Sequence, residues 1–191
     1  MLPDQATEGI QTVICNEDPW YLRVGRKLGL YRQDLTHSTI KDQVMAVPRA
    51  ELDFWRARVE ELKADALEDG PARGMLLHES IHCRQMRGRN FWLWSLRYLL
   101  SRRFRRRMEE EAYTIHLIYL AEQGIPIEAP YWMGHFRDLY FGAFKGRHAR
   151  DAFDRIAAAI REKVPNARIT ESVQESDAVP TYAPWMAEGE M

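Results

Sequence analysis

Two histidines and a glutamate near the middle of the chain form the pattern with the clearest chemical potential. His78, Glu79 and His82 give the sequence His-Glu-x-x-His within an apolar run. On an α-helix, positions i and i+4 lie on the same face, so both imidazoles can bind one metal ion. Glu79 follows His78 directly and would lie close enough to take a proton from water at that ion. The pattern therefore predicts a zinc site with a candidate general base.

A catalytic zinc site of this kind needs a third protein ligand and one open position. Three consecutive glutamates open a second apolar helix downstream, and Glu109 heads a face that continues with Tyr113 and His116. Glu109 is the favoured ligand, and Glu110 replaces it if the helix register differs. Tyr113 and His116 are candidate catalytic residues that donate hydrogen bonds to a developing oxyanion; the alternative is that both are core residues.

These two motifs resemble those of gluzincin metallopeptidases, whose third ligand is a glutamate on the next core helix. The step from Glu109 to Ala112 is similar to the Glu-x-x-Ala-Asp pattern of several gluzincin families. The segment 82–85 resembles the His-x-x-Gln ending of compact, often phage-encoded, metallopeptidase domains. Two positions depart from the family pattern: Arg84 replaces an apolar residue, and Tyr113 replaces the Asp. The hydrogen bond to a ligand histidine that the resemblance implies for this Asp must therefore come from another residue or be absent.

The resemblance covers residues 28–120 and implies a zinc-dependent peptidase. It implies that Zn²⁺ is bound by His78, His82 and Glu109, that Glu79 is the general base, and that the substrate is a peptide or protein. It also implies a small sheet before the metal-binding helix, whose edge strand holds the extended substrate by backbone hydrogen bonds.

The elements that must position these residues follow from periodicity and from Gly and Pro breaks. The fold class expected is α+β, with a small N-terminal β-sheet packed on a mainly helical, zincin-like body. Residues 1–164 form a single domain, and 165–191 form a weakly ordered C-terminal tail. Residues 1–19, with an apolar patch at 13–15, are expected to form an arm or a short strand. Extended segments are expected at 36–40 and 43–48, and helices at 48–67, 72–86, 91–100, 108–123, 131–144 and 151–163.

The segment that joins the two motifs is strongly basic. It carries no acidic residue between Glu79 and Glu109. Its nine arginines are Arg84, Arg87, Arg89, Arg97, Arg102, Arg103, Arg105, Arg106 and Arg107. Three interpretations are open: a helical hairpin with its guanidinium groups in solvent, an amphipathic segment on an anionic membrane surface, or a nucleic-acid face spanning Arg84–Arg107.

Composition limits the remaining function classes. The net charge of −1 argues against a polyanion partner for the protein as a whole. Cys15 and Cys83 form no disulfide framework and suit a reducing compartment. With no secretory signal and no apolar run long enough to cross a membrane, the expected location is the cytoplasm. Two rivals to a peptidase stay open: a non-catalytic binding protein that uses zinc to join two helices, and an interaction module that works through the basic segment. The oligomeric state is not predicted.

Overall fold

The computed structural model describes residues 14–17, 38–41, 44–47, 52–63, 70–139 and 143–171. Within these ranges the chain is α+β, as the sequence predicts: helices form the body, and short strands form two small sheets. The elements are, in chain order, β1 (Ile14–Glu17), β2 (Ser38–Lys41), β3 (Val44–Val47), α3 (Leu52–Lys63), α4 (Gly70–Met86), α5 (Phe91–Leu100), α6 (Arg102–Glu122), β4 (Ile127–Glu128), α7 (Ala129–Leu139), α8 (Arg147–Lys163) and β5 (Ile169–Thr170).

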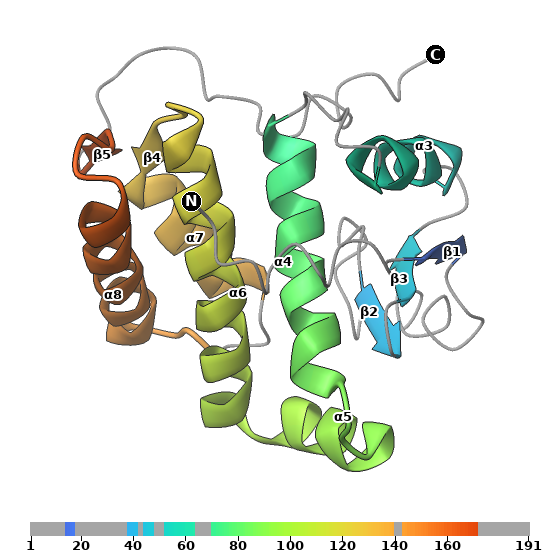
Figure 1. Cartoon of the computed structure of the whole chain (residues 1–191). Helices are drawn as coiled ribbons and strands as arrows, with labels where there is room; N and C mark the ends of the chain where they lie inside the picture. Colours follow the sequence, from blue (N-terminus) through green and yellow to red (C-terminus); the bar gives the residue numbers. More distant parts are fainter. Residues whose placement is uncertain are drawn as a thin grey trace, which may run out of the picture.

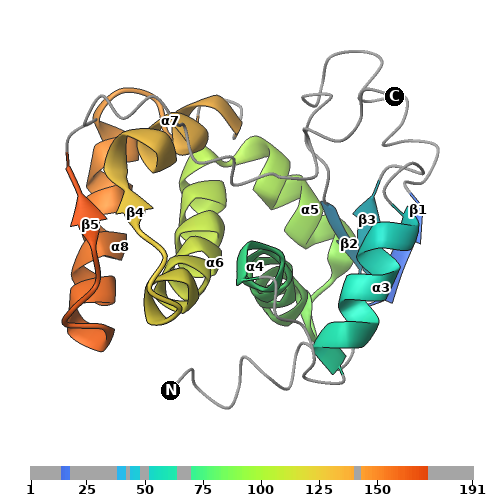
Figure 2. The same cartoon turned by 90° about the horizontal axis from the view of Figure 1, so that it is seen from above.

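The N-terminal strands form a three-stranded sheet of order β1-β3-β2, in which β1 is parallel and β2 antiparallel to β3. The extended segments predicted at 36–40 and 43–48 are confirmed as β2 and β3, and the apolar patch 13–15 overlaps β1. β2 forms one edge of this sheet and contacts α4. Figure 2 shows α3 and the sheet on one side of α4, and α6, α7 and α8 on the other.

α4 is the central helix of the body (Figure 1). The helix predicted at 72–86 is confirmed and begins slightly earlier, at Gly70. Pro71 fits this first turn because its missing N–H has no intrahelical partner there. Gly88 follows the helix with φ of 69°, a backbone conformation that glycine adopts without steric cost. Most side chains of α4 are buried, so this helix can present polar groups to a shielded interior.

The helix that carries the three glutamates begins earlier than predicted. The sequence predicts a helix at 108–123, whereas α6 runs from Arg102 to Glu122. Ser101 explains the earlier start, because its hydroxyl oxygen accepts a hydrogen bond from the N–H of Phe104 at 3.2 Å and caps the helix. Arginine is itself a good helix former, so the arginine run makes the first turns of α6 instead of a loop.

The helix α5 matches the prediction at 91–100 and is capped by Asn90, whose side-chain oxygen accepts from the N–H of Leu93 at 3.0 Å.

Among the described residues, no helix combines the length and the apolar character needed to cross a membrane. The helix predicted at 131–144 appears as α7, and α8 begins before its predicted start at residue 151.

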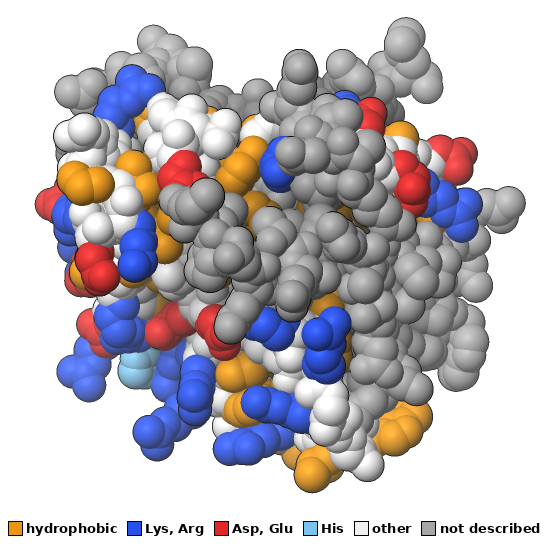
Figure 3. Space-filling model, viewed as in Figure 1, with side chains coloured by type: hydrophobic (Ala, Val, Ile, Leu, Met, Phe, Trp, Pro, Cys, Tyr) orange, Lys and Arg blue, Asp and Glu red, His pale blue; other side chains and the backbone are white. Residues whose placement is uncertain are grey.

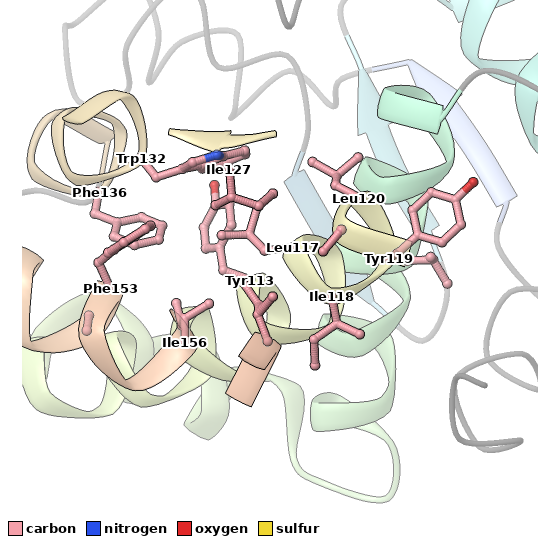
Figure 4. Packing of buried hydrophobic residues seen from close by; sticks show 14 of the residues in the cluster. Tyr113, Leu117, Ile118, Tyr119, Leu120, Ile127, Trp132, Phe136, Phe153 and Ile156 are labelled. Atoms are coloured by element: carbon pink, nitrogen blue, oxygen red, sulfur yellow. The ribbon is translucent and has the colours of Figure 1, made fainter. Parts of the chain in front are cut away.

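The hydrophobic core lies where α6, α7 and α8 meet (Figure 4). Its members from these helices and from β4 include Tyr113, Leu117, Leu120, Ile127, Trp132, Phe136, Phe153 and Ile156. On the side toward α4, Leu76 and Leu77 join the same core. α6 is therefore fixed on two sides, by α4 on one and by α7 and α8 on the other.

The structured body continues past the boundary predicted at residue 164. β5 pairs in parallel with β4, with Ile169 opposite Ile127, and the N–H of Ile127 donates to the carbonyl of Arg168 at 2.9 Å. Ile169 and Ala167 also pack against the core, which is why this polar-looking stretch is held in place. The rest of the predicted tail, residues 172–191, lies outside the described residues, as do residues 64–67 of the helix predicted at 48–67.

Candidate metal centre

Three side chains from two helices converge inside the body. His78 and His82 lie one turn apart on α4, and Glu109 faces them from α6. Nε2 of His82 lies 3.1 Å from Nε2 of His78, and Oε2 of Glu109 lies 3.4 Å from the His78 nitrogen and 3.5 Å from the His82 nitrogen. All three ligand atoms lie within 4.8 Å of one another. The structure thus brings together the three residues predicted as metal ligands.

Burial makes this cluster suited to a cation. His78, His82 and Glu109 are 3%, 7% and 1% exposed. Oε2 of Glu109 and Nδ1 of His78 are buried and have no hydrogen-bond partner among the residues that the structure describes. A buried carboxylate oxygen without a partner costs free energy unless a positive charge compensates it. Two imidazoles and a carboxylate are a ligand set that Zn²⁺ accepts, so the residues fit a bound divalent cation.

The electrostatics of the cluster favour positive charge. Burial by itself lowers the pKa of His82, but the carboxylates of Glu109 and Glu79 and the hydrogen bond that Nδ1 of His82 donates to Gln85 raise it to about 9. Burial raises the pKa of Glu109, but His82 and His78 hold that pKa well below its usual range. A proton and a metal ion therefore compete for the same position between these side chains.

Gln85 orients His82. Its side-chain oxygen lies 2.9 Å from Nδ1 of His82, and its amide nitrogen donates to the carbonyl of Met108 at 2.9 Å and to Glu111 at 3.1 Å. Because the amide N–H groups are used on α6, the oxygen that faces His82 accepts a hydrogen from Nδ1. That tautomer leaves the lone pair of Nε2 for a metal ion. Gln85 thus supplies the histidine partner that the Asp of the family pattern would otherwise give.

Tyr98 is a partner of the site that the sequence did not single out. Its hydroxyl donates a hydrogen bond to Oε1 of Glu109. Burial and the charge of Glu109 raise the pKa of Tyr98 well above its usual value, so the hydroxyl stays protonated and remains a donor. The buried guanidinium of Arg105 holds the end of α5 in place through the carbonyls of Tyr98, at 2.9 Å, and Leu99.

Glu79 lies beside the three clustered side chains. It is buried on α4 next to His78, and its charge is one of the contributions that raise the pKa values of His82 and Tyr98. Its carboxylate therefore influences both of these groups, although Glu79 is not one of the three clustered residues. This location suits the general base that the sequence predicts, and that role stays a prediction.

Tyr113 and His116 form an aromatic layer behind His78. The ring of Tyr113 packs edge-on against His78 with centroids 4.3 Å apart, and its hydroxyl lies 2.7 Å from Nε2 of His135 on α7. His116 is buried against Gly74 of α4, and burial together with the charges of His78 and His135 holds its pKa well below the usual value. Their predicted part in catalysis stays a prediction. His135 appeared isolated in the sequence, and only the packing of α7 on α6 reveals its contact.

The neighbouring glutamates point elsewhere. Glu110 receives two hydrogen bonds from Arg155 of α8, at 2.7 and 3.1 Å, on the opposite side of α6. Glu111 pairs with Arg84 at 2.6 Å near the surface. Among the three consecutive glutamates, Glu109 is the one that joins the histidine cluster, so the alternative ligand Glu110 is not brought to the site. The pair between Arg84 and Glu111 also explains how α4 accommodates a charge at this position.

Comparison of the chain with protein-family models, with curated proteins and with solved structures gives no match. The resemblance to gluzincins therefore rests on the residues of the two motifs. The function has to be inferred from the chemistry of the site.

Proposed function

We propose that the protein is a zinc-dependent metallopeptidase whose two ligand helices form a zincin-like centre. The proposal rests on the convergence of His78, His82 and Glu109 within 4.8 Å, with Glu79 buried beside them. These three side chains would hold Zn²⁺ and leave one coordination position open. When bound, zinc supplies a Lewis acid that acidifies water and polarises a carbonyl group.

The protein's own residues would transfer the proton and stabilise the developing negative charge. Glu79 would accept a proton from the attacking water and pass it to the leaving amine. Tyr113 would donate a hydrogen bond to the developing oxyanion in the tautomer of His135 that carries a hydrogen on Nε2. In that tautomer His135 donates to the Tyr113 oxygen, so the hydroxyl hydrogen of Tyr113 is available for the oxyanion. His116 would be neutral because its pKa is lowered, and its ring, stacked on that of Tyr113, would help to hold Tyr113 in place.

The strand β2 supports the choice of an extended peptide as substrate. It forms an edge of the N-terminal sheet and contacts α4, the helix that carries the histidines. An edge strand offers unpaired backbone N–H and C=O groups, which can align a peptide chain by strand addition. The proposed setting is the cytoplasm, which the buried free thiol of Cys83 suits.

A second function is favoured by one specific observation, the deep burial of the cluster. All three proposed ligands are less than a tenth exposed. A metal ion held there could simply join α4 to α6, as structural zinc sites do. In that case the protein would be a non-catalytic binding protein whose stability depends on the metal.

Cleavage of a mixed peptide library by the zinc-loaded protein separates these functions. Glu79→Gln keeps the shape of the side chain and removes the base, and Glu162→Gln makes the same change at an exposed site on α8. Zinc content is measured for all three proteins. We expect cleavage by the native protein and by Glu162→Gln, with at least about a 100-fold loss in Glu79→Gln. Full zinc occupancy without cleavage by the native protein would establish the structural role instead.

A further inference from the structure

The helix α5 has two faces of different character. On its inner face, the rings of Trp94 and Tyr98 stack with centroids 5.1 Å apart, and Phe104 of α6 packs edge-on against Trp94. Through Tyr98 this face reaches the metal centre. The outer face carries five exposed large apolar side chains: Trp92, Leu93, Leu96, Leu99 and Leu100.

The outer apolar residues form one continuous stripe. Their positions recur at three- and four-residue intervals, which places them on the same side of a helix. Each side chain is between 51% and 79% exposed. Single exposed apolar residues are normal, but a contiguous apolar patch on a small protein marks an interaction site. We use the name "α5 outer face" for these five residues.

A basic rim borders the α5 outer face. The exposed arginines next to it in the chain are Arg87, Arg89, Arg97, Arg102, Arg103 and Arg107. Within the described part of the chain, none of these six makes an ion pair, and no acidic residue lies between Glu79 and Glu109 to neutralise them. Figure 3 shows Lys and Arg side chains gathered at the end of the molecule where α5 and the start of α6 lie, beside hydrophobic side chains.

We propose that the α5 outer face docks on the surface of an anionic phospholipid bilayer. The leucines and Trp92 would enter the boundary between headgroups and acyl chains, and the arginines of the rim would contact lipid phosphates. This combination of an apolar stripe with a cationic border is typical of helices that lie in the membrane interface. The proposal does not depend on the peptidase activity.

The charge and the residue types favour lipid over other occupants. A second copy of the chain, docked face to face, would bring two basic rims together without intervening carboxylates. Single-stranded nucleic acid needs exposed rings on which bases can stack. Four of the five exposed residues are leucines, and the rings of Trp94 and Tyr98 are stacked on each other on the inner face.

Co-sedimentation of the full chain with vesicles tests the proposal. One set of vesicles contains phosphatidylcholine alone, and the other contains in addition about 30% phosphatidylserine. We expect binding to the anionic vesicles that weakens as salt is raised. The double variant Leu93→Ser with Leu96→Ser should lose this binding. Each arginine contributes about five-fold in affinity near an anionic surface, so Arg102→Glu with Arg103→Glu should weaken binding by at least about 25-fold.

A matched control changes the same charge elsewhere. Arg147 and Arg150 are exposed on α8, and replacing both by Glu alters the net charge of the protein by the same amount. This control should bind nearly as well as the native chain. Circular dichroism checks the fold of each variant. If the double leucine variant does not fold, the vesicle binding of the double arginine variant tests the proposal.

Four results would overturn the proposal. The first is that the native chain does not bind anionic vesicles, and the second is that the α8 control loses as much vesicle binding as the variant of Arg102 and Arg103. The third is that the native chain is a dimer without lipid whereas the leucine variant is a monomer. The fourth is that the native chain binds a single-stranded oligonucleotide but not vesicles.

Discussion

The hydroxyl of Tyr98 donates a hydrogen bond to one carboxylate oxygen of Glu109, and the other oxygen of that carboxylate faces the two histidines. The two oxygens of the Glu109 carboxylate therefore have different partners. Oε1 is fixed by the protein, and Oε2 is left for a cation. This arrangement fixes the orientation of the Glu109 carboxylate, the proposed third ligand, without a metal ion.

Removing the hydroxyl of Tyr98 should weaken metal binding. In Tyr98→Phe, Glu109 loses the hydrogen bond that orients it, so we expect zinc affinity to fall by roughly 10- to 100-fold. Competition with a chelating dye measures this change. Tyr131→Phe removes a hydroxyl from α7 and serves as the control. Equal affinities of Tyr98→Phe and the native protein would show that Glu109 is oriented without Tyr98.

Glutamate-to-glutamine substitutions at adjacent positions should separate the ligand from its neighbour. Glu109→Gln removes the carboxylate of the cluster. Zinc affinity should then fall by more than roughly 100-fold, which is the largest loss typical of removing a residue that only hydrogen-bonds to a metal ligand. Glu110→Gln disrupts the surface pair with Arg155, which should change the free energy of unfolding by less than about 1 kcal/mol and leave zinc affinity unchanged. Isothermal titration calorimetry on both variants checks the assignment. The opposite order of affinities would make Glu110 the ligand.

The metal-free protein should lose stability as pH rises from neutral to alkaline. The pKa of His82 is about 9 in the folded protein and 6.5 without interactions, so its contribution is fully present below pH 6.5 and is lost as pH approaches 9. This difference corresponds to roughly 3 kcal/mol in the free energy of unfolding. Urea unfolding in the presence of EDTA at pH 6 and pH 9.5 measures it.

The same protonation predicts that zinc displaces a proton. Titration of zinc at neutral pH in two buffers of different ionisation enthalpy should reveal proton release. His82→Gln should show neither this release nor the alkaline loss of stability. If that variant keeps the full pH dependence, His82 is not the group responsible.

Gly74 should not tolerate a side chain. A Cβ at this position would lie 2.6 Å from Cδ2 and 2.7 Å from Nε2 of the buried His116 ring. We expect Gly74→Ala to cost about 1–3 kcal/mol through overpacking, partly offset by the better helix propensity of alanine.

The matched control for Gly74 is Gly134→Ala on α7. The nearest atom to an added Cβ there is the Arg137 guanidinium, at 4.0 Å, so this change should stabilise the protein by roughly 0.5–1 kcal/mol. Thermal unfolding of the two variants compares them directly. Similar melting temperatures would mean that α4 and α6 do not approach closely at Gly74.

Sequence reasoning located the ligand helices because their signals are local. His78 and His82 share a face by spacing alone, and the position of Glu109 follows from the apolar residues after it. The α+β class and the strands β2 and β3 also follow from local patterns, whereas the sequence left β1 open as an arm or a short strand. The start of α6 lies earlier than the predicted residue 108 because the apolar pattern begins only there, whereas the Ser101 cap extends the helix through the arginine run.

The remaining features of the site depend on tertiary contacts. Nothing in the spacing of Tyr98 or His135 indicates that one reaches Glu109 and the other Tyr113, since both contacts need the packing of separate helices. Gln85 was noticed as part of a motif, but its bridge from His82 to α6 appears only in the structure. The short strand β5 was missed because two residues give no periodicity.

The order of the helices has a consequence for biosynthesis. The three proposed ligands come from one continuous stretch, α4 to α6, in which consecutive helices are joined by only a few residues. Contacts that are local along the chain close small loops and form early in folding. In a growing chain the complete set of proposed ligands is therefore synthesised before α7 and α8. If a metal ion binds these residues at that stage, metal shortage would act on folding as well as on the finished protein.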